Sequence, residues 1–449
     1  MDNALPVLFQ KVEELLDAKD MRGAAALLAE AHPGDVAEVI DFADEDHKCD
    51  LFLTLSKDRR PEVLSRVDDT TLTVLLARLS DEEISRAVDE LPTDDAADIV
   101  GQLTDEDADR VMALLEEEDQ ESIQKLLEHP EESAGGIMES EFVAVQEHAT
   151  VEEAVGVLRE RAEVVEQVQH VYVVDEGGRL TGILPLWRVA ISKPGASVDR
   201  FVERDVISVP VDMDQEEVAG VARRYDLLEV PVVDDGGVLV GRITIDDVLD
   251  VMEEEATEDI SRMAGTTDVE IGQTSVFRIS LIRLPWLMIG LLGGVGSALM
   301  ISQFEGQLEA KIALAFFVPV IMAMGGNVGI QCSSIVVRSL ALDEIESHHM
   351  GRRLLREFLI AALNGVILAT ILGLLALAWK GEADLGIIVG ISMFASILVA
   401  ATAGTVFPMA FMRLGFDPAL ATGPFVTTSN DLLNLLIYFL VAALLLGRM

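Results

Sequence analysis

An aspartate near the C-terminus lies in a stretch where an ionised side chain is costly. Asp431 follows Ala419 by twelve residues within an apolar segment, which places it ~18 Å along a helix and near the middle of a lipid bilayer. An ionisable group at that depth costs about 2.5–3.5 kcal/mol even on insertion scales, and it is by default a candidate functional residue. No lysine or arginine of the apolar segments is placed to pair with it. The carboxylate favours a cation path, with a protonated aspartate hydrogen-bonded between helices as the alternative.

A second apolar segment carries residues that a plain membrane anchor does not need. It contains Pro319 and the run Gly325-Gly326-Asn327-Val328-Gly329-Ile330-Gln331. Backbone freed by proline and glycine is tolerated within a membrane only where protein or a water-filled cavity surrounds it. Close helix packing through small residues is the alternative, and it explains the glycines but not Asn327 with Gln331.

A run of acidic residues from Asp246 to Asp259 precedes the apolar part of the chain. Its members Asp247, Asp250, Glu254 and Glu258 are three or four residues apart, so they share one face of the predicted helix. Like charges at this spacing destabilise an isolated helix. Solvation and salt could compensate for the repulsion, and bound divalent cations are an equally strong explanation, because carboxylate oxygens suit these ions.

The elements that position these groups begin with the membrane spans. Five apolar stretches each reach the ~20 residues needed to cross a bilayer, and they are Leu284–Phe304, Ile312–Leu340, Phe358–Trp379, Leu385–Phe411 and Ala419–Leu446. Seven basic residues flank them on one side and three on the other, namely Arg278, Arg283, Arg338, Arg352, Arg353, Arg356 and Arg413 against Lys311, Lys380 and Arg448. The positive-inside rule therefore predicts a multi-pass protein of the cell membrane with a cytoplasmic N-terminus and an extracytoplasmic C-terminus.

Charge is divided unevenly along the chain. The 449 residues include 33 basic and 78 acidic side chains, but ten of each follow residue 275, so the first 275 residues hold the whole net charge of −45. Such a surface attracts cations and excludes a nucleic-acid partner. Met1 to Lys11 lack the pattern of a cleavable signal peptide, so we expect the acidic part in the cytoplasm. No nucleophile and base of an enzyme stand out, and Cys49 and Cys332 do not suggest a disulfide framework.

The acidic part divides into two patterns. Residues 1–135 show short helices, in which Ser80, Thr93 and Thr104 are candidate N-caps followed by first-turn acids, as in a superhelical array. After residue 140, the run from Val171 to Leu184 repeats from Val230 at an offset of 59 residues, each copy a β-hairpin with an acidic Gly-Gly turn. The copies look like tandem CBS domains. We expect an all-α N-domain (1–135), an α/β CBS pair (136–250), a connecting acidic helix and linker (251–283) and a five-helix transmembrane domain (284–449).

The whole arrangement resembles the MgtE family of magnesium channels. The resemblance rests on motifs at the domain junction, in the CBS pair, in the acidic run and in two spans, namely His129-Pro-Glu-Glu-Ser-Ala-Gly, Tyr225-Asp226-Leu-Leu, 246–260, Gly325-Gly326-Asn327-x-Gly329-x-Gln331 and Phe425-Val-Thr-Thr-x-x-Asp431. It implies a homodimer in the membrane lipid, with a Mg²⁺ pore at the subunit interface that closes when cytosolic acids bind Mg²⁺. An exporter of Mg²⁺, Mn²⁺ or Co²⁺ coupled to another ion is the alternative.

The resemblance also implies functional residues. The pore set is Asp431 with Asn327, Gly325, Gly326, Gln331, Thr427 and Asn430. The regulatory metal ligands are Asp95, Asp226, Asp247, Asp250, Glu254, Glu255, Glu258 and Asp259. A nucleotide such as ATP is a weaker expectation, carried by Thr244, Asp247 and Arg188, because the first CBS copy lacks the Thr-x-x-Asp signature. His170 and Leu227 also stand where aromatic side chains that stack on adenine would be expected.

Overall fold

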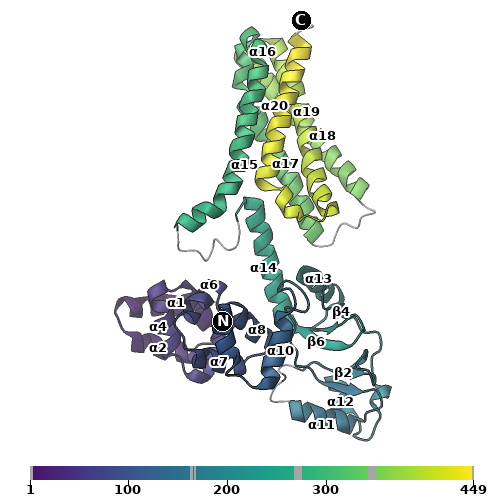
Figure 1. The fold of residues 1–449 in the computed structure, drawn as a ribbon. Helices are drawn as coiled ribbons and strands as arrows, with labels where there is room; N and C mark the ends of the chain where they lie inside the picture. The colour runs from purple at the N-terminus through teal and green to yellow at the C-terminus, as the bar shows by residue number, and fades with distance from the viewer. Residues whose placement is uncertain (1–3, 162–164, 166–167, 267–275, 342–349, 447–449) are drawn as a thin grey trace. The chain divides into compact units, whose positions relative to one another are not determined.

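The computed structural model describes residues 4–161, 165, 168–266, 276–341 and 350–446. These residues form two compact units, Met1–Glu253 and Glu254–Met449, which we describe separately (Figure 1). Part of the predicted linker, residues 267–275, lies outside the described residues.

Ten α-helices open the first unit. They are α1 (Ala4–Asp17), α2 (Met21–Glu30), α3 (Pro33–Phe42), α4 (Glu45–Thr54), α5 (Arg60–Leu64), α6 (Asp69–Leu76), α7 (Asp81–Asp89), α8 (Thr93–Gly101), α9 (Asp105–Met112) and α10 (Glu117–Leu127), with a 3₁₀ turn η1 (Lys57–Arg59) before α5. Ser80 caps α7 in a capping box with Glu83, and Thr104 caps α9, as predicted. The predicted cap at Thr93 is wrong: Pro92 holds the cap position, and the Thr93 hydroxyl donates to Oε2 of Glu141 at 2.7 Å.

Two three-stranded sheets follow with the same topology. The first joins β1 (Ala144–Gln146), β2 (His170–Val174) and β3 (Leu180–Pro185), and the second joins β4 (Val209–Pro210), β5 (Glu229–Val233) and β6 (Leu239–Thr244). In each sheet the first strand is parallel to the second and the second is antiparallel to the third. Gly178 and Gly237, 59 residues apart, take positive φ in the two hairpin turns. The predicted duplication is therefore confirmed.

Helices and a linker complete the first unit. The helices are α11 (Val151–Arg161), α12 (Leu186–Ile191), α13 (Gln215–Tyr225) and the first part of α14 (Ile245–Ala264), with a 3₁₀ turn η2 (Val198–Arg200). The linker after α10 crosses the edge of β6, where the backbone N–H of Glu139 donates to the carbonyl of Arg242 at 2.8 Å. A Cβ atom on Gly241 would lie 2.8 Å from the backbone carbonyl oxygen of Glu139, so glycine permits this close approach of the two backbones. The contact holds Glu139 against the second sheet.

The helix predicted for the acidic run is present, but the predicted domain boundary does not fall at its start. The predicted division between residues 250 and 251 falls inside α14, which runs without a break from the end of β6. Val248 and Val251 are both buried in the core of the first unit, so the helix continues past that position. The division of the chain into two compact units falls within α14, between residues 253 and 254.

The second unit is a helical bundle. Its elements are α15 (Val276–Gln303), α16 (Glu305–Ala310), η4 (Ile312–Phe316), α17 (Val318–Ala341), α18 (Met350–Lys380), α19 (Ala383–Arg413), η5 (Pro418–Ala421) and α20 (Gly423–Leu446). Among the described residues five segments are long and apolar enough to cross a membrane, namely Val276–Gln303, Ile312–Leu340, Gly351–Lys380, Ala383–Arg413 and Pro418–Leu446. The predicted five spans are confirmed, although the first begins earlier than the predicted Leu284. Helix α19 is the most buried of them and α15 the least.

Glycines let the helices of this bundle approach closely. A Cβ atom on Gly325 of α17 would lie 1.7 Å from Nδ2 of Asn434 in α20, and one on Gly329 would lie 1.9 Å from Nδ2 of Asn430. Both asparagines are fully buried. Close packing through small residues, the alternative weighed for this segment, therefore accounts for these two glycines.

Candidate ion-binding sites

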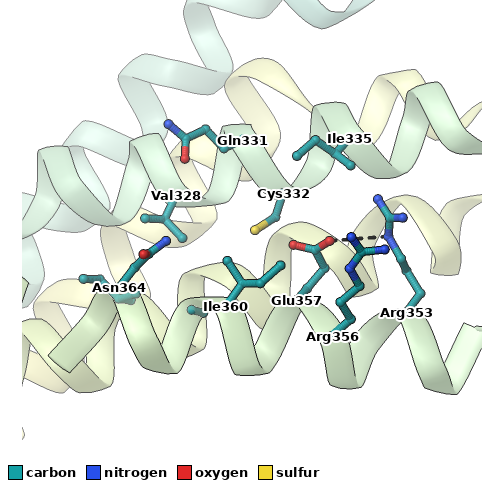
Figure 2. A pocket seen from close by; sticks show the side chains of 11 residues that line it. Val328, Gln331, Cys332, Ile335, Arg353, Arg356, Glu357, Ile360 and Asn364 are labelled. Carbon is teal, nitrogen blue, oxygen red and sulfur yellow. Dashed lines mark ion pairs between the residues drawn. The ribbon is translucent and has the colours of Figure 1, made fainter. Parts of the chain in front are cut away.

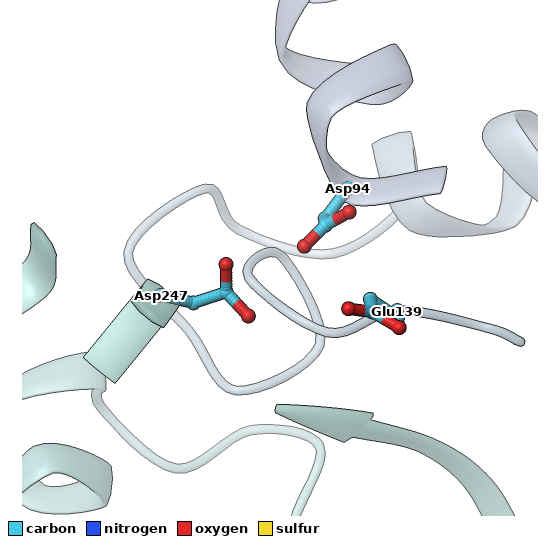
Figure 3. Close-up of side chains that lie close together, drawn as sticks. All are labelled: Asp94, Glu139 and Asp247. Atoms are coloured by element: carbon cyan, nitrogen blue, oxygen red, sulfur yellow. The ribbon is translucent and has the colours of Figure 1, made fainter. Parts of the chain in front are cut away.

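Three carboxylates from separate parts of the first unit converge on one point. Asp94 is the second residue of α8, Glu139 belongs to the linker against β6, and Asp247 is the third residue of α14. One oxygen of each lies within 4.8 Å of one oxygen of the other two, and Figure 3 shows the three side chains pointing toward one another. We call these three residues the carboxylate triad.

Local hydrogen bonds hold the members of the triad. Oδ2 of Asp247 accepts from the backbone N–H of Thr244 at 3.0 Å and from its hydroxyl at 2.5 Å, which fixes the first turn of α14. Oε2 of Glu139 accepts from Nε and Nη2 of Arg242 at 3.0 and 2.6 Å. Oδ1 of Asp94 is buried and has no hydrogen-bond partner among the described residues. Hydrogen bonds thus fix the side chains of Asp247 and Glu139, whereas Oδ1 of Asp94 is left without a partner among the described residues.

Burial and mutual repulsion disfavour the ionised form of these acids. Burial, followed by the charge of Asp247, raises the pKa of Asp94 well above its usual range and that of the neighbouring Asp95 to about 7. Burial raises the pKa of Glu139 to about 7, against the charge of Arg242, and that of Asp247 to about 6. Arg242 also lies 3.6 Å from Glu229, so it does not neutralise the triad. A divalent cation would supply the missing positive charge.

The ligand set suits a hard cation. Three carboxylates offer only oxygen, with no thiol or imidazole, and this is the donor type that Mg²⁺ and Ca²⁺ prefer. Mg²⁺ usually keeps several waters, so it needs few protein oxygens.

The structure gathers only part of the predicted regulatory set at this point. Asp247 is in the triad, and Asp95 lies beside it on α8, where the charge of Asp247 reaches its carboxyl group. Asp226 lies elsewhere, exposed at the end of α13 with a left-handed backbone. Asp250 is exposed on the next turn of α14.

Sequence reasoning did not select two members of the triad. Asp94 is adjacent to the predicted Asp95, and its signal was the Thr93-Asp94-Asp95 run that opens a helix. One residue along a helix turns the side chain by about 100°, so the choice between the two depends on packing. Glu139 lies in an irregular linker that carries no periodic pattern. Nothing local distinguishes it from the many other acids.

The remaining predicted regulatory acids belong to the second unit. Arg262 of α14 forms ion pairs with Glu258, one turn earlier, and with Asp417 of the loop before η5. Burial, with the charges of Asp417 and Glu255, raises the pKa of Asp259 to about 6. The predicted ligand Glu254 lies on the same helix and is exposed. This acidic cluster lies where α14 contacts the start of the fifth span, since Gly423 packs against the carbonyl oxygen of Met263.

The predicted pore residues lie on two helices of the bundle. Asp431 of α20 is half-buried and forms no ion pair with any described residue. The hydroxyl of Thr427, one turn earlier on the same face, donates to the carbonyl of Gly423 at 2.8 Å. Asn430 turns away from that face and packs against α17. Asp431 and Thr427 therefore share one face of α20, and Asn430 lies on another face of the same helix.

The predicted pore residues of α17 differ in exposure, because its amide side chains are exposed and its glycines are buried. Asn327 and Gln331, one turn apart, are exposed on the surface of the single chain. Gly325 and Gly326 are buried within an uninterrupted helix, where backbone carbonyls accept bonds from N–H groups one turn later. The two amide side chains are therefore better placed to reach an ion or a partner than the glycine carbonyls.

The residues of the weaker nucleotide expectation have protein partners. Thr244 and Asp247 bond to each other, as described above. Arg188 pairs with Glu203 at 2.9 Å and donates to the carbonyl of Phe201 at 3.0 Å. His170 lies 3.9 Å from the buried carboxylate of Glu229.

The fold and these sites define a class of protein. Its described residues include five helices long and apolar enough to span a membrane, and an acidic helical and α/β unit whose converging carboxylates suit a divalent cation. Family models match residues 31–132 (MgtE intracellular N domain), 134–191 and 198–254 (CBS domain) and 318–441 (MgtE, divalent cation transporter). The chain belongs to the MgtE family, which confirms the resemblance, the fold class and the prediction that it is not an enzyme.

Known magnesium transporters are similar in sequence to most of this chain. The magnesium transporter MgtE of Thermus thermophilus is 40% identical over 320 residues, and that of Bacillus subtilis is 37% identical over 314. These matches cover 71% and 70% of this chain and the same shares of the relatives. A crystal structure of the cytosolic domain of the Mg²⁺ channel MgtE in complex with ATP is 36% identical, with a TM-score of 0.50 over 54% of this chain and 99% of that one.

Proposed function

We propose that this chain is a homodimeric Mg²⁺ channel of the cell membrane, and that cytosolic Mg²⁺ closes it by binding to its acidic groups. The observation that carries the regulatory part is the carboxylate triad, which brings the buried Asp94 and Glu139 together with the half-buried Asp247 and leaves one oxygen of Asp94 without a hydrogen-bond partner among the described residues. The magnesium transporters of the family, 37–40% identical over about 70% of the chain, support Mg²⁺ as the ion.

The pore proposal rests on the chemistry of a hydrated ion. Mg²⁺ dehydrates reluctantly, so a site of few carboxylates and amides suits it better than a closed protein cage. Two copies of Asp431 around a dimer axis, with Thr427 on the same face, would place negative charge and hydroxyl oxygens along such a path. Asn327 and Gln331, exposed on the single chain, support a role for α17 at the surface that a second subunit covers.

Gating follows from the charge of the first unit. A ligand shifts a two-state equilibrium only by its differential affinity for the two states. Without Mg²⁺, repulsion among the acids favours the open state. Bound Mg²⁺ replaces repulsion by shared coordination at the triad, and the acids around Arg262 are the second place where this can happen. Closure therefore requires that the ion bind the closed arrangement more tightly.

Flux through purified protein tests the function directly. Full-length protein in liposomes should pass Mg²⁺ down its gradient, at a rate that a membrane potential changes and a proton or Na⁺ gradient does not. A rate that depends on the gradient of a second ion would instead support the coupled exporter.

The proposed orientation predicts which loops react from outside the cell. Glu309→Cys, between the first two spans, should react with a membrane-impermeant thiol reagent in intact cells. Gly351→Cys, at the start of the third span, should react only after permeabilisation. The reason is the excess of basic residues on the second side. Both native cysteines are buried, which limits background labelling. Labelling of Gly351→Cys in intact cells would invert the topology.

Raised pKa values predict that Mg²⁺ stabilises the protein more at high pH. Acids whose pKa is raised on folding stabilise the metal-free fold at low pH, and this contribution is lost as pH rises through about 6–7. Saturating Mg²⁺ should restore the stability lost at high pH. We expect it to raise the melting temperature by about 5–10 °C at pH 8 and by much less at pH 5.5. Asp94→Asn should remove most of the difference. Equal shifts at both pH values would contradict a site built from these acids.

A further inference from the structure

The membrane unit contains a charged cavity whose lining, apart from Gln331, has no role in the proposed function. It has a volume of about 270 Å³ and lies between α17 and α18, and Ile397 of α19 also lines it. Figure 2 shows Arg353, Arg356 and Glu357 together at one end, and Gln331 and Asn364 at the other. A cavity that gathers three charged side chains, one of them the nearly buried carboxylate of Glu357, is a candidate binding site for a charged ligand.

The charges of this cavity favour an anion. Nε of Arg353 lies 3.4 Å from Oε1 of Glu357, whose side chain is only 8% exposed, so these two charges offset each other. That nitrogen is buried and has no hydrogen-bond partner among the described residues. Arg356 adds a second positive charge for which the described residues provide no ion pair. Two guanidinium groups against one carboxylate leave the cavity with a net positive charge.

The outer face of α18 continues from the charged end as an open, mostly apolar surface. This surface shares Arg356 and Ile360 with the cavity and adds Arg352, Leu355 and Leu359. Leu355 and Leu359 are both 58% exposed and lie one turn apart on the outer face of α18. A ligand that occupies the cavity and lies along this surface must therefore join an anionic group to a long apolar chain.

We propose that this cavity binds the phosphate diester of an anionic membrane lipid, with the acyl chains along Leu355 and Leu359. Arginine is suited to phosphate because its planar guanidinium group donates two parallel hydrogen bonds. The Arg-bearing end of α18 lies at the end of its span, at the level of lipid headgroups, where basic pockets between helices bind such groups. A zwitterionic headgroup brings its own cation, which the net positive charge disfavours. The amides of Gln331 and Asn364 line the other end of the same cavity.

Lipid retention by the full-length protein tests this proposal. The protein is purified from membranes containing equal amounts of phosphatidylglycerol and phosphatidylcholine, and bound lipid is counted by native mass spectrometry. The wild type should retain phosphatidylglycerol preferentially. Arg356→Gln should weaken that retention by about fivefold or more. Arg413→Gln, at the exposed end of α19, removes the same charge away from the cavity and should leave retention unchanged. Equal retention by both variants would overturn the site.

Two further measurements distinguish a lipid from free phosphate, and a loss of binding from a loss of folding. Leu359→Asn should also reduce retention, while millimolar inorganic phosphate should not displace the lipid. Displacement by phosphate, or full retention by Leu359→Asn, would overturn the lipid assignment. Glu357→Gln removes the negative charge and should strengthen retention, an effect opposite to that of a damaged fold. Melting temperatures of all variants in phosphatidylcholine alone verify that each is folded.

Discussion

Asp431→Asn is expected to reduce Mg²⁺ flux in liposomes by on the order of a hundredfold while leaving a folded protein. A unit charge 4 Å from another contributes about 4 kcal/mol at the effective dielectric near a protein surface, and a divalent ion interacts more strongly. Each 1.4 kcal/mol corresponds to about tenfold in affinity. Neutralising the side chain also removes the cost of placing a carboxylate in the membrane, so the variant should insert and fold at least as well as the wild type.

The matched control for this variant is Asp384→Asn. Asp384 is an exposed acid at the start of α19, and its change removes the same charge from the same unit. Its flux should stay within a few-fold of the wild type, provided that size-exclusion profiles and melting temperatures agree. Wild-type flux in Asp431→Asn would remove Asp431 from the ion path and leave the alternative of a protonated aspartate that only joins helices.

The double variant Asp94→Asn/Asp247→Asn is expected to shift inhibition by cytosolic Mg²⁺ to concentrations at least about tenfold higher. Loss even of groups that only support metal ligands costs about 10–100-fold in affinity, and these two side chains are proposed to bind the ion directly. Burial disfavours the ionised form of both acids when no metal is bound, so neutral amides at these positions should not unfold the protein. Open probability recorded in patches against cytosolic Mg²⁺ measures the shift.

A charge-matched control separates binding from diffuse screening. Glu38→Gln/Glu82→Gln removes two acids that are exposed on the first unit and lie outside the triad. Exposed charges are screened by salt over a Debye length of about 10 Å at 0.1 M, so this control should leave the inhibition curve nearly unchanged. If both double variants shift the curve equally, the sensor is general negative charge. If neither does, it lies elsewhere, and the acids around Arg262 become the next candidates.

Periodic patterns allowed much of the fold to be predicted. Five apolar stretches, a repeat at an offset of 59 residues and caps such as Ser80 and Thr104 are local signals, and the structure has the corresponding elements. Local signals failed where a tertiary contact competed with them. Thr93 bonds to the linker instead of capping its helix, and α14 continues through the predicted boundary because Val248 and Val251 are buried.

The sequence by itself determined the class of this protein, because span length, charge distribution and repeat spacing are properties of short segments. It also pointed to Asp431, since a carboxylate in an apolar segment is costly wherever the helices pack. Only the tertiary structure decided which acids meet. Asp94, Glu139 and Asp247 are far apart in the chain, and their convergence depends on a linker held against Gly241 and on the side chain direction at the start of α8. Among 78 acidic residues, only packing in three dimensions distinguishes these three from a solvated surface.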